Sequence, residues 1–319
     1  MPSRWLCMLI VAFWLGMMGW LAGREWWIRY GAPPTMYTAM DAATSGGLET
    51  VTVKWRILGN EQLVGTAETG IHFESRANSF VMHQTVHLDI DKVGNLPLFQ
   101  FLGPVLNNLQ VKKLTVHATT ETNSFGDVNR FALHIEIPNP YRVPTGKVEP
   151  PKPIAKFGLE TRLKSDGKLW GRPSLVLNDM PYQLPAPLDQ DYALPYRVRD
   201  VAFGSLCPLD RMPGLRPGQT WQTPVADPSS LIMFGMPGGE HGVLTTLMDR
   251  QPAHVRVLPT PEVLQWKGEA IFCWIVVTDQ DNLHLRIWVQ QSDGLILKQS
   301  AEWGATKIDI IREATETPN

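Results

Sequence analysis

The clearest pattern along the chain is an alternation of apolar and polar residues that begins near Thr50. Val51, Val53, Trp55 and Ile57 are separated by polar residues, as in a strand with one buried face. Residues 80–90 alternate in the same way, with apolar residues at most even positions and polar residues at most odd ones. The same criterion predicts strands at 62–74, 114–120, 131–137, 156–165, 168–177, 243–249, 254–258, 269–278, 283–291 and 295–302.

Turn signals separate several of these strands. Gly59-Asn60, Asp166-Gly167 and Asp293-Gly294 are dipeptides typical of tight turns between antiparallel strands. Only residues 96–109 have helical spacing, and we expect a short helix or a buried loop there. Because no other helical stretch lies between consecutive strands to carry parallel crossovers, the pattern favours antiparallel pairing. The pattern predicts a mainly β fold of antiparallel sheet, either a curved half-barrel or a sandwich.

A different pattern occupies the N-terminus, where residues 5–23 form an uncharged apolar run between Arg4 and Arg24. As a helix this run has a length of about 28 Å, close to the hydrocarbon thickness of a bilayer. Trp20 or Leu21 would occupy a signal-peptidase position that requires a small side chain, which favours a retained anchor over a cleaved signal. We therefore expect an N-terminal transmembrane helix, with the long remainder of the chain outside the cytoplasm, in the periplasm.

Proline and glycine mark the expected boundaries. Six prolines lie between residues 138 and 153, and proline cannot donate to a sheet ladder. The expected organisation is a membrane anchor at 1–29, a linker at 30–49, a first β half at 50–137, a proline-rich connection at 138–155, a second β half at 156–311 and a tail at 312–319.

Charge and cysteine content narrow the function. Leaving out Arg4, Arg24, Arg29 and Glu25 from totals of 29 basic and 31 acidic residues gives the rest of the chain a net charge of −4. This balance argues against a nucleic-acid partner, which requires a concentrated basic surface. The three cysteines exclude a disulfide-dense scaffold. Cys207 and Cys273 are either a disulfide or two buried thiols.

No pattern for catalysis or metal binding stands out. Ser205 lacks the second glycine of a nucleophile elbow, and Cys273 lies in an apolar strand that disfavours its thiolate. His83 and His87 share a strand face but are about 13 Å apart, too far to bind one ion. The pair His134 and Glu136, like Asp89 and Asp91, requires partners from another strand to hold a metal. We therefore assign no catalytic residue, no metal ligand and no cofactor.

Tryptophan is the residue type in this chain that best suits the lining of a ligand site. Seven of the twelve tryptophans lie in or beside the predicted strands. Aromatic rings on a concave sheet bind sugars or acyl chains, and the candidates for lining such a surface are Trp55, Trp221, Trp274 and Trp288. The alternative is that these rings fill the β core.

Five stretches of the sequence resemble known proteins. The stretch from Val53 to Asn60, followed by residues 63–69, resembles the opening strands of uncharacterised bacterial envelope proteins. Residues 214–221, 270–277 and 288–298 are similar to the second half of the same group. The resemblance implies the lipoprotein-carrier fold, a concave antiparallel sheet around hydrophobic cargo. A retained anchor and the proline-rich insert depart from a shuttle that leaves the membrane.

Together these features predict a membrane-anchored, extracytoplasmic β protein that binds or scaffolds, with lipid or an envelope protein as partner. The competing hypothesis is a hydrolase of envelope polymers with its site on the proline- and glycine-rich loops. A third is a subunit of a larger membrane assembly.

Overall fold

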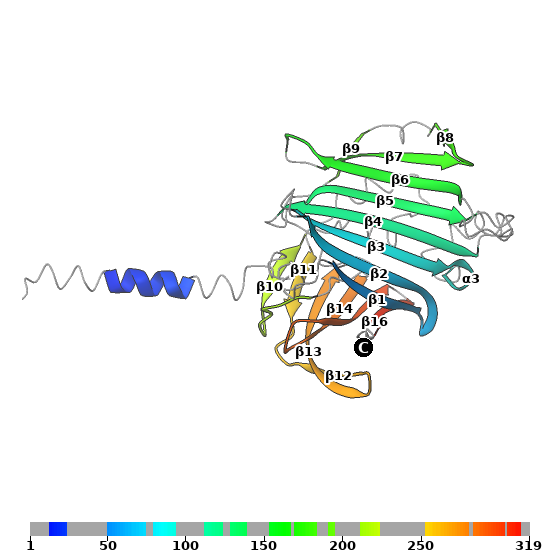
Figure 1. The fold of residues 1–319 in the computed structure, drawn as a ribbon. Helices are drawn as coiled ribbons and strands as arrows, with labels where there is room; N and C mark the ends of the chain where they lie inside the picture. Colours follow the sequence, from blue (N-terminus) through cyan, green and yellow to red (C-terminus); the bar gives the residue numbers. More distant parts are fainter. Residues whose placement is uncertain are drawn as a thin grey trace, which may run out of the picture.

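The structure is a computed structural model of the chain. It describes residues 13–23, 50–74, 79–93, 112–123, 128–138, 153–166, 169–183, 191–194, 211–223, 253–280, 283–303 and 305–313. The predicted mainly β, antiparallel fold is confirmed, because these residues form one antiparallel sheet of 16 strands (Figure 1).

The first half of the sheet is a meander in which each strand pairs with the next. Its strands are β1 (Thr50–Gly59), β2 (Gln62–Glu74), β3 (Ser79–Asp89), β4 (Lys113–Asn123), β5 (Val128–Pro138), β6 (Pro153–Leu163), β7 (Leu169–Leu177) and β8 (Met180–Tyr182), with β9 (Tyr192–Leu194) also paired to β7. A short helix, α3 (Ile90–Val93), follows β3.

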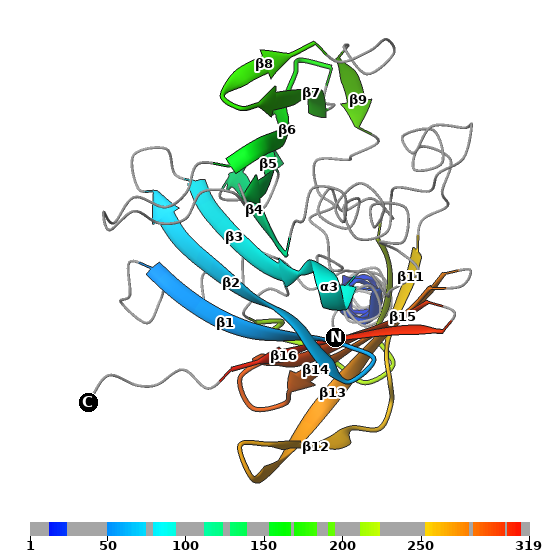
Figure 2. The ribbon, with the colours of Figure 1, turned by 90° about the vertical axis from the view of Figure 1, so that its right-hand side faces the viewer.

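The second half continues the sheet on the other side of β1. Its strands are β10 (Thr220–Thr223), β11 (Ala253–Val257), β12 (Glu262–Trp266), β13 (Glu269–Gln280), β14 (Leu283–Gln290), β15 (Ile296–Trp303) and β16 (Thr306–Arg312). The strand β16 pairs with β1, and so joins the two halves. Within the described residues the sheet runs from β10 to β8 and these end strands do not pair, so the sheet is open. Figure 2 shows that it curves along this path.

Most strand predictions are confirmed within a few residues, and the differences have physical causes. The first turn lies at Asn60 and Glu61, one residue later than predicted. Both have positive φ angles of 46° and 71°, as in the tight turn that matches strand twist. Asn60 is held by hydrogen bonds with the backbone of Lys307, at 2.8 Å to its carbonyl oxygen and 2.9 Å from its amide. Asp91 lies in α3 instead of sharing a strand face with Asp89.

The sequence analysis missed five strands, which are β8, β9, β10, β12 and β16. The strand β16 ends at Arg312, inside the predicted tail of residues 312–319. The strands extend into both ends of the proline-rich connection predicted at 138–155. The strand β5 ends at Pro138, β6 begins at Pro153, and these two residues pair. The predicted strand at 243–249 and the predicted helix or loop at 96–109 lie outside the described residues.

The structure describes only part of the predicted N-terminal transmembrane helix. A helix spans residues 13–23, and residues 5–12 of the predicted run lie outside the described residues. In the portion of the chain that the structure describes, no helix combines the length and the apolar character that crossing a membrane requires.

Two apolar clusters lie on opposite faces of the sheet. The larger fills the concave face and draws on both halves, with Trp55, Val86, Leu133 and Val289 among its buried members. The smaller lies on the opposite face of β13–β15, around Cys273, Ile275, Val277 and Leu297. These clusters explain why residues 273–277 of β13 are apolar at consecutive positions: this part of the strand packs on both faces.

The smaller cluster exists because the β12–β13 hairpin reaches across the convex face. The indole nitrogen of Trp266 donates to the carbonyl oxygen of Arg312 on β16 at 3.2 Å. Glu262 pairs with Arg286 on β14 at 2.6 Å. These contacts connect β12 to two strands, β14 and β16, with which it does not pair.

Candidate functional site

The concave face carries continuous apolar rows that cross the sheet from strand to strand. Side chains of directly paired residues lie on the same face. One such row consists of Trp55, Ala67, Val86, Val116, Ile135, Phe157, Leu175 and Tyr182. A second row ends with Ile137, Ala155, Leu177 and Met180. Both rows run from the packed core to the last strand of the meander.

Burial falls steadily along the first row. Trp55 is 0% exposed and Val116 is 5% exposed, whereas Ile135, Phe157 and Leu175 are partly buried and Tyr182 is 53% exposed. In the second row, Leu177 is 36% exposed and Met180 is 71% exposed. The apolar face therefore continues beyond the core that covers it, onto β6, β7 and β8. This stretch of β5–β8, named here the apolar ramp, is the candidate binding surface.

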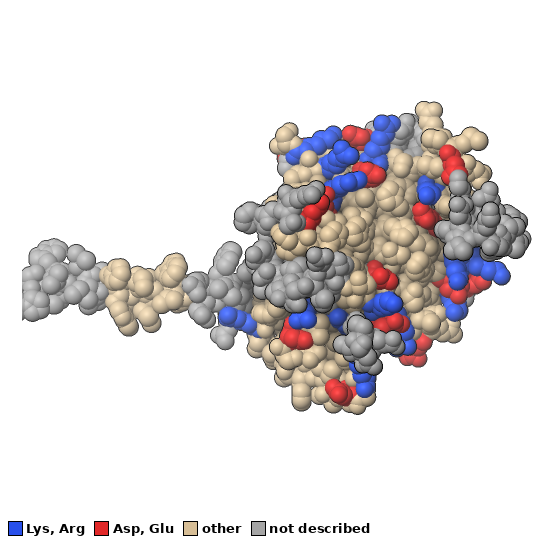
Figure 3. All heavy atoms as spheres, viewed as in Figure 1, with Lys and Arg blue, Asp and Glu red and all other residues tan. Residues whose placement is uncertain are grey.

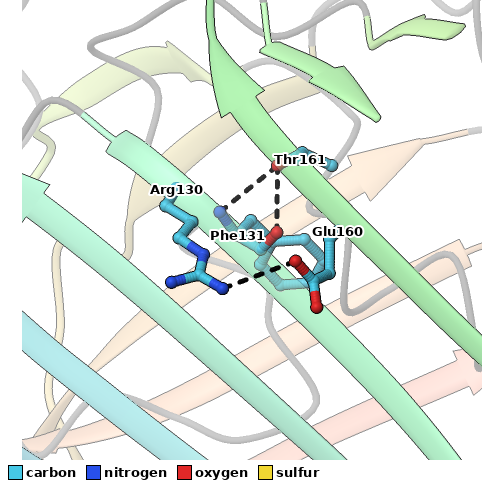
Figure 4. Close-up of polar contacts among 4 residues, drawn as sticks. All are labelled: Arg130, Phe131, Glu160 and Thr161. Carbon is cyan, nitrogen blue, oxygen red and sulfur yellow. Dashed lines mark hydrogen bonds and ion pairs between the residues drawn. The ribbon is translucent and has the colours of Figure 1, made fainter. Parts of the chain in front are cut away.

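The geometry at β5 and β6 fixes which side chains reach the ramp. Arg130 and Glu160 form an ion pair at 3.4 Å on the convex face. The hydroxyl of Thr161, which is buried, accepts from the amide of Phe131 at 3.2 Å and donates to its carbonyl oxygen at 3.1 Å (Figure 4). These contacts hold the register in which Ile135 faces Phe157.

The four tryptophans predicted to line a ligand site do not share one surface. Trp55 and Trp221 are buried in the concave cluster, and Trp274 packs against it. Trp288 packs on the opposite face, where its ring lies 5.1 Å from the guanidinium of Arg286 and 5.0 Å from the ammonium of Lys298. The rings of Trp55 and Trp221 thus fill the core, and the ramp is lined by aliphatic residues with Phe157 and Tyr182.

The convex face of β3 and β4 carries three histidine–threonine pairs. In each, a histidine Nδ1 lies 3.2 Å from a threonine Oγ1, and the pairs are His83–Thr119, Thr85–His117 and His87–Thr115. Desolvation, together with nearby His72, lowers the pKa of His83. Desolvation also lowers the pKa of His117, against an opposing influence of Glu136.

These side chains do not form a metal site. Among the described residues, no group of three or more His, Cys, Asp or Glu side chains is arranged to hold a metal ion. His83 and His87 both lie exposed on the same face of β3, as their spacing predicted. His134 pairs with His117, and Glu136 pairs with Thr115 and forms an ion pair with Lys156 at 3.2 Å.

Cys273 is a free thiol that is fully buried. Burial, reinforced by the negative charge of Glu262, raises its pKa to about 11. At neutral pH it is a thiol with little nucleophilic character, as its position in an apolar strand predicted. Cys207 and Ser205 lie outside the described residues.

Comparison with known proteins identifies no family. No family model matches the chain, and no curated protein matches it. Among solved structures the chain is similar to the beta-barrel-like protein of domain of unknown function DUF1849 from Brucella abortus. The identity is 7%, the match covers 83% of this chain and 94% of that chain, and the TM-score is 0.37. The predicted likeness to lipoprotein carriers stays a prediction.

Sequence reasoning missed the ramp itself. Its residues, including Phe157, Leu175 and Met180, look like ordinary strand residues, because alternation shows which residues share a face and not whether that face is covered. Only the order of the strands shows that β8 ends the sheet and leaves Met180 and Tyr182 exposed.

Proposed function

We propose that this protein is a binding module that holds the apolar part of an amphiphile, such as an acyl chain, against the apolar ramp. The observation that carries the proposal is the continuation of the concave apolar rows onto β7 and β8. There Met180 is 71% exposed and Tyr182 is 53% exposed. A ligand that covers these residues completes the burial that the core provides at the other end of each row.

The chemistry of the ramp favours a lipid-like ligand over a sugar or a peptide strand. Its lining is apolar from Ile135 to Leu177, and an apolar surface gains free energy by excluding water without requiring specific hydrogen bonds. The rows cross several strands, so an extended chain lying along one row remains in contact with apolar groups over its length.

The N-terminal apolar run supports a membrane location for this module. We propose that the run anchors the protein and that the sheet lies on the extracytoplasmic side, where amphiphiles of the membrane are close at hand. An envelope protein with an attached lipid group is a second type of partner, because its acyl chain presents the same apolar surface to the ramp.

The proposal is tested by binding of a named probe. The full chain is held in lipid nanodiscs and titrated with 11-(dansylamino)undecanoic acid, and energy transfer from tryptophan to the dansyl group is measured against empty nanodiscs. Saturable binding that lauric acid displaces is the expected result. Transfer that never saturates, or that lauric acid leaves unchanged, contradicts the proposal.

A further inference from the structure

Histidine is concentrated on one face of the sheet. Five of the eight histidines of the chain, which are His72, His83, His87, His117 and His134, lie on neighbouring strands β2, β3, β4 and β5. The register places His117 opposite His134, and the rings of His72 and His83 stack with centroids 5.2 Å apart. In Figure 3, the middle of this convex face is an area without Lys, Arg, Asp or Glu, bordered by charged residues.

The three histidine–threonine pairs set the spacing of the imidazoles. Each pair joins β3 to β4 two residues from the next, so successive rings lie about 7 Å apart along the seam. That spacing is too wide for two Nε2 atoms to bind one metal ion. Because Nδ1 is engaged by a hydroxyl, the Nε2 atom of each ring is the one left for another partner. A hydroxyl also accepts from an imidazolium, so the pairs persist when the rings become charged.

The charged residues around the histidines nearly balance one another. Three nearby carboxylates already have basic partners: Asp89 pairs with Lys92, Glu136 with Lys156, and Glu160 with Arg130. The other charged groups facing the histidines are Glu68 of β2, opposite Thr85, Lys113 of β4, opposite Asp89, and Glu121 of β4, opposite Arg130 of β5. Glu68 also lies opposite Lys54 of β1, so five acidic and five basic residues lie around the histidines. Each imidazole that is protonated adds a positive charge to this balanced set.

We propose that this histidine face of β2–β5 is a docking surface for anionic lipid headgroups that binds in acid and releases at neutral pH. The inference rests on the proposed function, since it gives the lipid-binding module a second, regulated contact with the membrane. A headgroup layer fits better than a single small anion, because the imidazoles are spread over four strands. Each positive charge brought near an anionic membrane surface strengthens binding about fivefold.

The test uses the full chain in vesicles, with Val81→p-benzoylphenylalanine as a photocrosslinker. Val81 lies on the histidine face, opposite His72, and is not itself titratable. Vesicles contain either phosphatidylcholine alone or phosphatidylcholine with 30% phosphatidylglycerol, and lipid adducts are counted by mass spectrometry at pH 5.0 and 7.5. A matched control places the crosslinker at Val263, which is exposed on the β12–β13 hairpin.

At position 81 we expect adducts with phosphatidylglycerol to rise at least fivefold from pH 7.5 to 5.0, with no rise in phosphatidylcholine vesicles. The variant His83→Gln/His87→Gln/His117→Gln, with a melting temperature at pH 7.5 within a few degrees of the unsubstituted chain, is expected to lose the rise. The single variant His87→Gln, whose side chain is exposed, is expected to reduce this rise.

Four outcomes overturn the proposal. They are equal adducts at the two pH values, an equal rise in both vesicle types, a rise that survives the triple substitution, and crosslinks to a second copy of the chain. Dansyl-fatty-acid binding at pH 7.5 is independent of these histidines, so failure here is distinguishable from failure of the proposed function.

Discussion

Replacing Met180 with serine tests whether the apolar ramp holds an acyl chain. Met180 is 71% exposed. Complete burial of a methionine side chain is worth about 2 kcal/mol, so covering the exposed part contributes about 1.4 kcal/mol to binding. That free energy corresponds to about a tenfold change in Kd. We therefore expect Met180→Ser to weaken binding of 11-(dansylamino)undecanoic acid about tenfold.

The matched control is Phe272→Ser. Phe272 is 58% exposed and pairs with Val263 on the β12–β13 hairpin, away from the ramp. Its replacement removes a comparable apolar surface and is expected to leave the Kd of the probe unchanged. Both variants are expected to melt close to the unsubstituted chain, because the lost groups are mostly solvated already. The reasoning is refuted if Met180→Ser binds like the unsubstituted chain, or if Phe272→Ser is weakened as much.

Three further predictions concern stability. Because the pKa values of His83 and His117 lie below the ordinary 6.5, the unfolded chain binds more protons in acid. The free energy of unfolding should therefore fall as pH drops through and below 6.5, and His83→Gln/His117→Gln should flatten that fall in thermal melts from pH 5 to 8. Gly65→Ala should cost about 1–3 kcal/mol in urea unfolding, since its Cβ would overlap the backbone oxygen of His87. Gly70→Ala, whose Cβ meets nothing within 4 Å, should change stability by less than about 0.5 kcal/mol. Thr161→Val should lower the unfolding free energy by about 1–3 kcal/mol, because the amide of Phe131 loses its acceptor, and equal urea midpoints would contradict this.

Local patterns predicted the strands because each strand has its own alternation. The strand β3 was predicted at 80–90 and lies at Ser79–Asp89, and β14 was predicted at 283–291 and lies at Leu283–Gln290. Fold class followed from the lack of helices between strands. The strand β12 was missed because it is short and bounded by a turn at Lys267 and Gly268, both with positive φ angles.

Long-range pairing could not be predicted from these patterns. The strand β16 pairs with β1 across almost the whole chain, and nothing local in Thr306–Arg312 indicates its partner. The face on which each tryptophan lies could not be predicted for a related reason. Trp274 and Trp288 lie on adjacent strands, but Trp274 pairs with Val289 and Trp288 with Ile275, so the two rings lie on opposite faces of the sheet.

The histidine face could not be predicted either, because it also requires knowing which strands pair and in which register. The sequence placed His83 and His87 on one strand face and His134 on another strand. Only the register of β3 with β4 and of β4 with β5 brings His117 between them. Threonine at 115 and 119 then provides the hydroxyls that hold the rings in a row.

The way the sheet ends favours a ligand that lies on its face over one that extends its edge. An edge strand with free amides and carbonyl groups recruits another strand, and natural edges are commonly blocked by short strands and by proline. The strand β8 is three residues long and has Pro181 at its centre, which lacks an amide hydrogen. Pro181 pairs with Val176, between the pairs that place Met180 and Tyr182 on the concave face. The edge is therefore a poor template for another strand, while the apolar side chains beside it remain exposed. A protein selected only to avoid contact would have polar residues at positions 180 and 182, so their apolar character is best explained by an occupant of the concave face.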